Sequence, residues 1–286
     1  LAGQVGDLDE DATKFVKAIR SELEARGPRC VVIPGAEQSA DVHALCHQIN
    51  QQSGAVGNTV TFIDEPEADR LSHVGSIRAL TDAMNAGDVK TLLILGGNPV
   101  YNVPADVKFA EALNQVETTI RLGDYVDETS RQCSWHLPRA HWLESWGDGR
   151  AWDGTVSVQQ PMILPLYEGR SSIELLAQLL GRTQADGQSL VKKTWSDSLG
   201  GDSFLKAWRD VLHAGVVADS AASARSVRAS AAASGNVDVP GMGHELLLAP
   251  SPHVYDGRFA NNAWLHETPH PLSKVTWDNA VHLSIA

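Results

Sequence analysis

Residues 91–104 read Thr91-Leu-Leu-Ile-Leu-Gly-Gly-Asn-Pro-Val-Tyr-Asn-Val-Pro104. The unbroken apolar run Leu92–Leu95 predicts a strand that is buried on both faces, as in a parallel sheet covered by helices. Two glycines end this strand, and Asn98-Pro99 turns the chain because the proline ring fixes φ and restricts the residue before it. Helical spacing of apolar residues then predicts a helix within 105–114. Ligands bind at the carboxyl ends of such strands, although a tight turn without a ligand explains the same residues equally well.

The pattern on both sides of this segment indicates an α/β fold. Short apolar runs alternate with helical segments, which predicts a doubly wound, Rossmann-like parallel sheet with right-handed crossovers. The chain has no G-x-G-x-x-G fingerprint, so a standard nicotinamide site is not supported. The expected strands are Cys30–Ile33, Val60–Ile63, Leu92–Leu95 and Thr118–Leu122, and the expected helices between them are Asp9–Ala25, Ala40–Gln52 and Gly75–Ala86.

The second half of the chain predicts part of a second α/β region. A helix capped by Ser171 or Ser172 runs to Leu180, and an amphipathic helix follows over Phe204–His213. Residues 218–235 are rich in Ala and Ser and predict a flexible connection, after which Glu245–Ala249 predicts a strand. We therefore expect a first domain over 1–182 and a second segment over 183–286. The start without Met and the abrupt end lead us to expect a fragment of a larger chain.

Composition excludes several classes of function. The formal net charge of −12 argues against nucleic-acid binding, which needs a basic face. No apolar run of about 18 residues occurs, so we expect no membrane span. The three cysteines, Cys30, Cys46 and Cys133, form no Cys-x-x-Cys pair, which argues against an iron–sulfur or zinc-ribbon site in this segment.

Two parts of the chain carry candidate site residues. His43 and His47 lie four apart on a helix and fit a metal pair, but buried or half-buried helix histidines explain them better. Residues 124–160 carry four of the eight tryptophans and predict a long, packed loop with short strands. His136 and Glu144 in this loop are candidates for acid–base work, with a structural role favoured.

The order of several short motifs resembles the molybdopterin oxidoreductases of the dimethyl-sulfoxide-reductase type. Taken together, the motif sequences are most similar to those of the large iron–sulfur/molybdopterin-type subunit of bacterial alternative complex III. This branch of the family also resembles polysulfide reductase. The resemblance extends from Val32 to Asn279. Its motifs are Gly97-Asn98-Pro99, Tyr125-Val126-Asp127-Glu128-Thr129, Trp135-His136-Leu137-Pro138, His141-Trp142-Leu143-Glu144-Ser145-Trp146-Gly147-Asp148, Asp153-Gly154, Asn261-Asn262-Ala263-Trp264-Leu265 and Pro271-Leu272-Ser273-Lys274-Val275-Thr276-Trp277-Asp278-Asn279.

The resemblance implies a set of cofactor contacts. In members that carry the cofactor, the Gly-x-Asn-Pro turn and the Glu-Thr loop line the nucleotide ends of a bis-pterin guanine dinucleotide. Carried over, the cofactor-binding residues are Gly97, Asn98, Pro99, Glu128 and Thr129. Glycine lets backbone N–H groups approach a phosphate, and Asn with a carboxylate pairs with guanine edges. The chain departs from the family where Ser134-Trp135-His136 stands in place of Ala-Asp, which puts bulk where a guanine would need space.

Two functions follow from the resemblance, and a third remains beside them. In the first, the segment is a cofactor-free scaffold of an electron-transfer subunit in a quinol-oxidising respiratory complex. In the second, it is the pterin-guanine-dinucleotide-binding middle domain of a molybdenum oxidoreductase. The third is a non-redox α/β binding domain. We expect the scaffold function, with no catalytic residue, no metal-binding residue and no cofactor in the segment. Only the second function would give the full-length protein molybdopterin guanine dinucleotide as its cofactor.

The resemblance also implies partners and a compartment. The partners would be the rest of the parent chain and other subunits of a membrane-associated redox complex, on the periplasmic or other extracytoplasmic side and peripheral to the membrane. The parent would be an oxidoreductase, and the segment alone would show no turnover because the metal ligand and the cluster cysteines of the family lie outside it. For Gly97 we expect a φ that only glycine adopts readily, or an N–H that faces open space.

Overall fold

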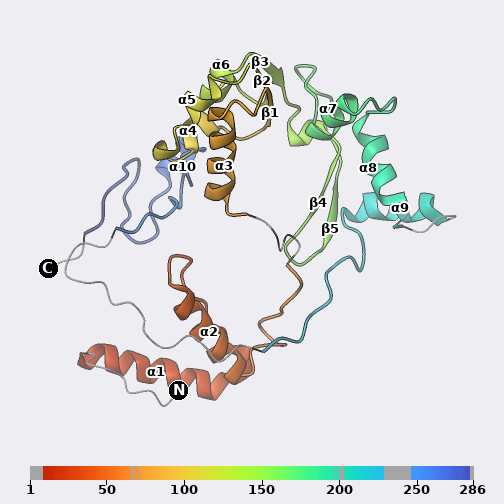
Figure 1. Ribbon diagram of the computed structural model, residues 1–286. Helices are drawn as coiled ribbons and strands as arrows, with labels where there is room; N and C mark the ends of the chain where they lie inside the picture. The colour runs from red at the N-terminus through yellow and green to blue at the C-terminus, as the bar shows by residue number, and fades with distance from the viewer. Residues whose placement is uncertain are drawn as a thin grey trace. The chain divides into compact units, whose positions relative to one another are not determined.

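The computed structural model describes residues 9–65, 67, 69, 71–196, 198–199, 203–228 and 246–283. The chain divides into two compact units (Figure 1). Unit 1 is built from residues up to 65 and from 222–249, and unit 2 from 66–221 and from 250 onwards. This division differs from the boundary after residue 182, which stays a prediction. Across that boundary, Gly187 donates its N–H to Glu174 Oε1 at 3.1 Å.

Unit 1 contains the first two helices, and a side chain caps the start of each. The side chain of Asp9 accepts the N–H of Ala12, and that of Ser39 accepts the N–H of Val42. A side-chain oxygen at this position satisfies one of the free N–H groups of the first turn. The elements are α1 (Glu10–Arg26), the 3-10 helix η1 (Gly27–Arg29) and α2 (Ala40–Gln52).

The strands predicted over Cys30–Ile33 and Val60–Ile63 are wrong. Among the described residues neither segment joins a sheet, and Val60 forms only an isolated bridge with Val56. A side chain takes the place of a neighbouring strand: Asn50 accepts the N–H of Val32 at 2.7 Å and donates its amide to the Val32 carbonyl at 2.8 Å. An apolar run predicts an extended chain, whereas a strand also needs a partner ladder.

Unit 2 holds a three-stranded parallel sheet, which confirms the α/β class. The strands are β1 (Thr91–Leu95), β2 (Thr118–Gly123) and β3 (Trp135–Pro138), in the order β1-β2-β3. The register aligns Ile94 with Arg121 and Arg121 with His136, so these three residues share one face of the sheet. We predicted a long loop with short strands over 124–160, and residues 135–138 form one such strand, which is the third strand of this sheet.

Helices and the sheet enclose the first core of unit 2. Its buried members are Met84 from α3 and Phe109, Ala112 and Leu113 from α5, and Leu92 and Ile94 of β1 pack against them. Figure 1 shows α3 beside the sheet. The predicted helix within 105–114 is broken, because Lys108 adopts a left-handed conformation with φ 54°. The elements are α3 (His73–Asn85), α4 (Pro99–Asn102), η2 (Ala105–Val107), α5 (Phe109–Leu113) and α6 (Glu128–Gln132).

A second core lies under the β4–β5 hairpin. Val158, Val191, Trp208 and Val211 are buried together, and the Trp208 and Trp146 rings stack with centroids 6.4 Å apart. Ser171 caps α7 and forms a capping box with Glu174. The elements are η3 (Trp142–Glu144), β4 (Gly147–Arg150), β5 (Val156–Gln159), α7 (Ser172–Leu179), α8 (Gly187–Ser196), α9 (Phe204–Ala214) and α10 (Ala263–Glu267).

The strand predicted over Glu245–Ala249 is wrong for the part that can be compared, since residues 246–249 form no strand and Glu245 lies outside the described residues. In the predicted connection, 222–228 form neither helix nor strand, and 229–235 lie outside the described residues. In the described part of the chain, no helix is both long enough and apolar enough to cross a membrane.

Replacing Asn50 by Ala should destabilise the chain. The substitution leaves the Val32 N–H and carbonyl without their partner, and Asn50 is only 5% exposed. We expect a loss of about 1–3 kcal/mol in the free energy of unfolding, measured by urea titration, and faster hydrogen exchange at the Val32 amide. The control is the exposed Gln52→Ala on the same helix, which should change stability by less than about 0.5 kcal/mol. An Asn50→Ala variant as stable as this control would contradict the account.

Candidate functional site

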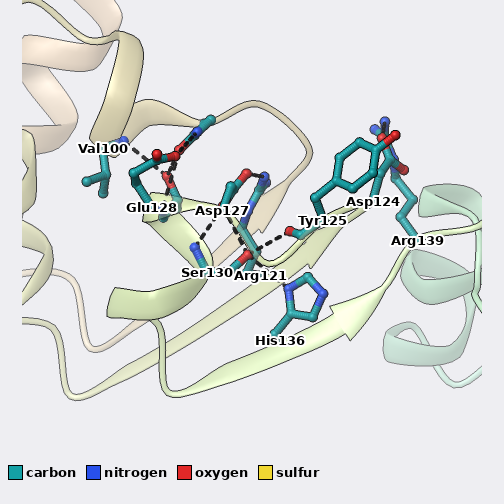
Figure 2. A network of polar contacts seen from close by, with 11 residues as sticks. Val100, Arg121, Asp124, Tyr125, Asp127, Glu128, Ser130, His136 and Arg139 are labelled. Carbon is teal, nitrogen blue, oxygen red and sulfur yellow. Dashed lines mark hydrogen bonds and ion pairs between the residues drawn. The ribbon is translucent and has the colours of Figure 1, made fainter. Parts of the chain in front are cut away.

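The two motifs that the resemblance singled out meet in space. The turn after β1 carries Asn98, and its amide oxygen accepts the N–H and the hydroxyl of Thr129 at 3.2 and 2.7 Å. The amide nitrogen of Asn98 donates to Glu128 Oε2 at 2.7 Å. The Thr129 hydroxyl also accepts the N–H of Val100 at 3.1 Å (Figure 2). We call Asn98, Val100, Glu128 and Thr129 the Asn98 clamp, because their bonds join the β1–α4 turn to the start of α6.

The two glycines of the turn adopt conformations that suit only glycine well. Gly96 and Gly97 have φ of +76° and +68°. A Cβ on Gly96 would lie 2.6 Å from Arg139 Nη1, whereas a Cβ on Gly97 would meet open space. The positive φ of Gly97 confirms the expectation for its conformation. Arg139 is held above Gly96 by a two-pronged ion pair with Asp124, at 2.9 and 2.7 Å.

The members of the clamp differ in exposure. Thr129 is fully buried, and Pro99 opens α4 at a half-buried position. Glu128 is exposed, and the hydrogen bond from Asn98 is the main cause that lowers the pKa of its carboxyl. One oxygen of Glu128 therefore faces solvent as an ionised acceptor, while the other belongs to the clamp.

Beside the clamp, β2 buries an arginine. Arg121 is 3% exposed, and its Nη2 donates to Asp127 Oδ2 at 2.5 Å. Gly123 leaves room for the guanidinium, because a Cβ there would lie 3.1 Å from it. Among the described residues, Nε and Nη1 of Arg121 find no hydrogen-bond partner. The Asp127 carboxylate is thus the described counter-charge of a buried cation.

Asp127 links this ion pair to α6 and β3. Burial opposes ionisation of its carboxyl, but hydrogen bonds from Arg121 and Ser130 outweigh that effect and hold the pKa of Asp127 below its usual value. Its Oδ1 accepts both the N–H and the hydroxyl of Ser130, at 2.9 and 3.0 Å. The Ser130 oxygen lies 3.0 Å from His136 Nδ1, so the network runs from β2 through α6 to β3 (Figure 2).

These contacts bear on whether a guanine dinucleotide fits the turn. Recognition of a guanine edge needs a free amide and a free carboxylate. The Asn98 amide oxygen already has two donors, its nitrogen already binds Glu128, and the Thr129 hydroxyl is buried between Asn98 and Val100. In this arrangement the Asn98 amide oxygen and the Thr129 hydroxyl already have partners inside the protein, so a guanine contact through either group would have to replace one of these bonds.

The other candidate residues have structural partners. Both oxygens of Glu144 accept backbone N–H groups, those of His141 and Leu166, at 3.0 and 3.2 Å. Trp135 and His136 are neighbours on a strand and point to opposite faces, so they do not fill one space together. The expectation that this bulk stands where a guanine would need space stays a prediction.

The histidine pair on α2 shows no partner ligands. His43 is half-buried, and His47 is exposed with its ring 5.8 Å from that of Phe62. No group of three or more His, Cys, Asp or Glu side chains in the described ranges is placed to hold a metal ion.

Sequence reasoning missed Arg121 and Asp127 as a pair. The signal was present, because an arginine interrupts the apolar residues of the predicted strand Thr118–Leu122. A charge inside a buried strand needs a counter-charge nearby. The acidic loop that follows the strand offers several, and only the fold selects Asp127.

Comparison with known proteins finds distant structural likenesses. No protein-family model matches the chain, and no curated protein matches it. Among solved structures the chain is similar to acetylene hydratase from Pelobacter acetylenicus, at 20% sequence identity and a TM-score of 0.36. The match covers 41% of this chain and 18% of that one, so the chain spans less than a fifth of that protein. A likeness at this level carries no argument about function.

Thr129→Val should weaken the clamp without changing the size of the side chain much. Valine cannot accept the Val100 N–H or donate to Asn98, so two buried polar groups lose a partner. We expect a loss of about 1–3 kcal/mol in the free energy of unfolding, measured by urea titration. The matched control is Thr91→Val at an exposed strand position, where the change should stay below about 0.5 kcal/mol. Equal stability of the two variants would argue against the clamp.

Asp127→Asn should reveal the buried ion pair through its dependence on pH. The folded-state pKa of Asp127 is lowered, so its contribution is present above the unfolded value of about 4 and is lost as the pH falls through the folded value. Near neutral pH the variant should lose about 3–5 kcal/mol, because Arg121 keeps its burial without a counter-charge.

The difference between wild type and Asp127→Asn should then shrink as the pH is lowered below about 4. Urea titrations at neutral pH and at a pH below about 4 measure this difference. The control is the exposed Asp88→Asn, which should leave the free energy of unfolding nearly unchanged at both of these pH values. A difference that does not depend on pH would contradict the assignment.

Proposed function

We propose that the chain is a region of the large subunit of a molybdopterin-oxidoreductase-like respiratory complex, and that this region is a cofactor-free scaffold. The ordered motif series supports the family, and the α/β sheet is compatible with it. One observation carries the scaffold role: the amide oxygen of Asn98 accepts two hydrogen bonds from Thr129, and its nitrogen donates one to Glu128. In this proposal the motif residues hold two turns together instead of holding a nucleotide.

Nucleotide binding at this turn depends on hydrogen-bond donors and acceptors that are free to bind the ligand. A side chain that binds a nucleotide must exchange water for the ligand, and a group already paired inside the protein must first break that bond. Releasing the Asn98 amide oxygen would leave the hydroxyl and the N–H of the buried Thr129 without their acceptor. Nucleotide binding through Asn98 would therefore have to offset this loss.

The second function, a pterin-guanine-dinucleotide-binding domain, has its own support. Gly97 is exposed, with open space where a Cβ would stand, and Glu128 is an exposed carboxylate. Backbone N–H groups and a carboxylate at the end of a strand suit a nucleotide. The two functions differ in their use of Asn98, so they are separable by experiment.

As a proposal, the partners are the rest of the parent chain and the other subunits of a membrane-associated, quinol-oxidising complex. The complex would lie on the extracytoplasmic side, and iron–sulfur clusters elsewhere in the parent would carry the electrons. The region itself would contribute shape and attachment surfaces.

The metal and pterin content of the full-length parent, purified from its own membranes, tests the proposal. We expect iron without molybdenum or tungsten, and no fluorescent pterin after acid oxidation. A molybdenum oxidoreductase of known content, carried through the same purification, is the control. Stoichiometric molybdenum with a pterin would overturn the scaffold role and would favour the second function.

A further inference from the structure

A groove of about 470 Å³ lies between α7 and α8 in unit 2. Its apolar wall comes from Ile173, Leu176 and Ala177 of α7 and from Leu190 and Val191 of α8. Leu176 remains 41% exposed, and Leu180, just beyond α7, remains 73% exposed. Exposed apolar side chains that line a hollow mark a surface where another molecule binds.

The rim of this groove is cationic. Arg182 and Lys193 line it, both are exposed, and neither forms an ion pair with any residue that the structure describes. The carboxylate at the groove, Asp148, accepts the indole N–H of Trp195 at 2.6 Å. The chain as a whole carries a net charge of −12. The two cations outnumber the single carboxylate that lines the groove, whereas the chain as a whole is acidic, and this local excess of positive charge favours an acidic partner.

We propose that the groove binds an amphipathic, acidic helix of a partner protein. Leucine-like side chains spaced i, i+3, i+4 and i+7 would cover Leu176 and Leu180, and the acidic flank would meet Arg182 and Lys193. A helix suits this groove better than a small ligand, because the groove is open and its leucines remain largely exposed. The proposal is independent of the proposed function, since it uses neither the clamp nor a cofactor.

Two synthetic peptides of about 15 residues test the proposal. They share the same leucines and differ only in their flanks, which are glutamate in one and lysine in the other. Fluorescence anisotropy of each labelled peptide is measured against the purified full chain. We expect the acidic peptide to bind more tightly, with an affinity that falls as salt is added.

Variants of the rim and the wall identify the surface. Arg182→Ala combined with Lys193→Ala should weaken the acidic peptide by about 2- to 30-fold, as two exposed charge pairs are lost. Leu176→Asp, at a half-exposed position, should reduce binding of both peptides. The matched control combines Lys206→Ala with Arg209→Ala on α9, which should leave the affinity unchanged. Circular dichroism checks that each variant is folded.

Equal affinity of the two peptides, or an unchanged affinity in the Arg182/Lys193 double variant, would overturn the proposal. Anionic phosphatidylglycerol vesicles are tested beside the peptides. Binding of the vesicles through the same two cations, without binding of the acidic peptide, would also overturn it and would assign the surface to a membrane.

Discussion

The side-chain amide of Asn98 connects the two turns on which the described part of the sheet depends. One turn leads from β1 into α4, and the other leads from β2 into α6. The hydroxyl of the buried Thr129 donates to Asn98 and accepts the N–H of Val100, so these bonds link the two turns. The two glycines before Asn98 allow the sharp turn that brings the amide to this place. The clamp thus sets where α6 begins.

The position of α6 in turn fixes the buried ion pair. Asp127 caps α6 and also pairs with Arg121, so the same carboxylate ends a loop, starts a helix and neutralises a buried cation. Ser130 passes the contact on to His136 of β3. The hydrogen bonds of Asp127 and Ser130 join loop, helix and strand in one arrangement, although Nε and Nη1 of Arg121 find no partner among the described residues. A scaffold needs such rigidity, whereas a nucleotide site needs groups that remain free.

Local signals predicted the local structure well. Ser171 predicted the start of its helix, because a cap depends only on the next few residues, and the first two helices lie within one residue of their predicted bounds. Non-local pairing could not be predicted in the same way. The run Cys30–Ile33 resembles a strand, yet the backbone of Val32 bonds to the side chain of Asn50. Short strands were expected within 124–160, but the pairing of 135–138 with β2 was not.

The sequence also predicted which motif residues come together, but not how they use their hydrogen bonds. Asn98, Glu128 and Thr129 would give the same sequence motif whether their side chains contact a guanine or one another. What decides the chemistry is the number of donors and acceptors that stay free, and that number follows from distances. The role of these residues as cofactor contacts is untested and stays a prediction by resemblance.

Hydrogen exchange at the Val100 amide, with and without guanosine diphosphate, tests the clamp most directly. This amide donates to the Thr129 hydroxyl and reports on the closed clamp. The account predicts slow exchange that does not change when the nucleotide is added. A change in exchange at Val100 and at the Thr129 amide on addition of the nucleotide would show that the turn opens to bind it, and would contradict the account.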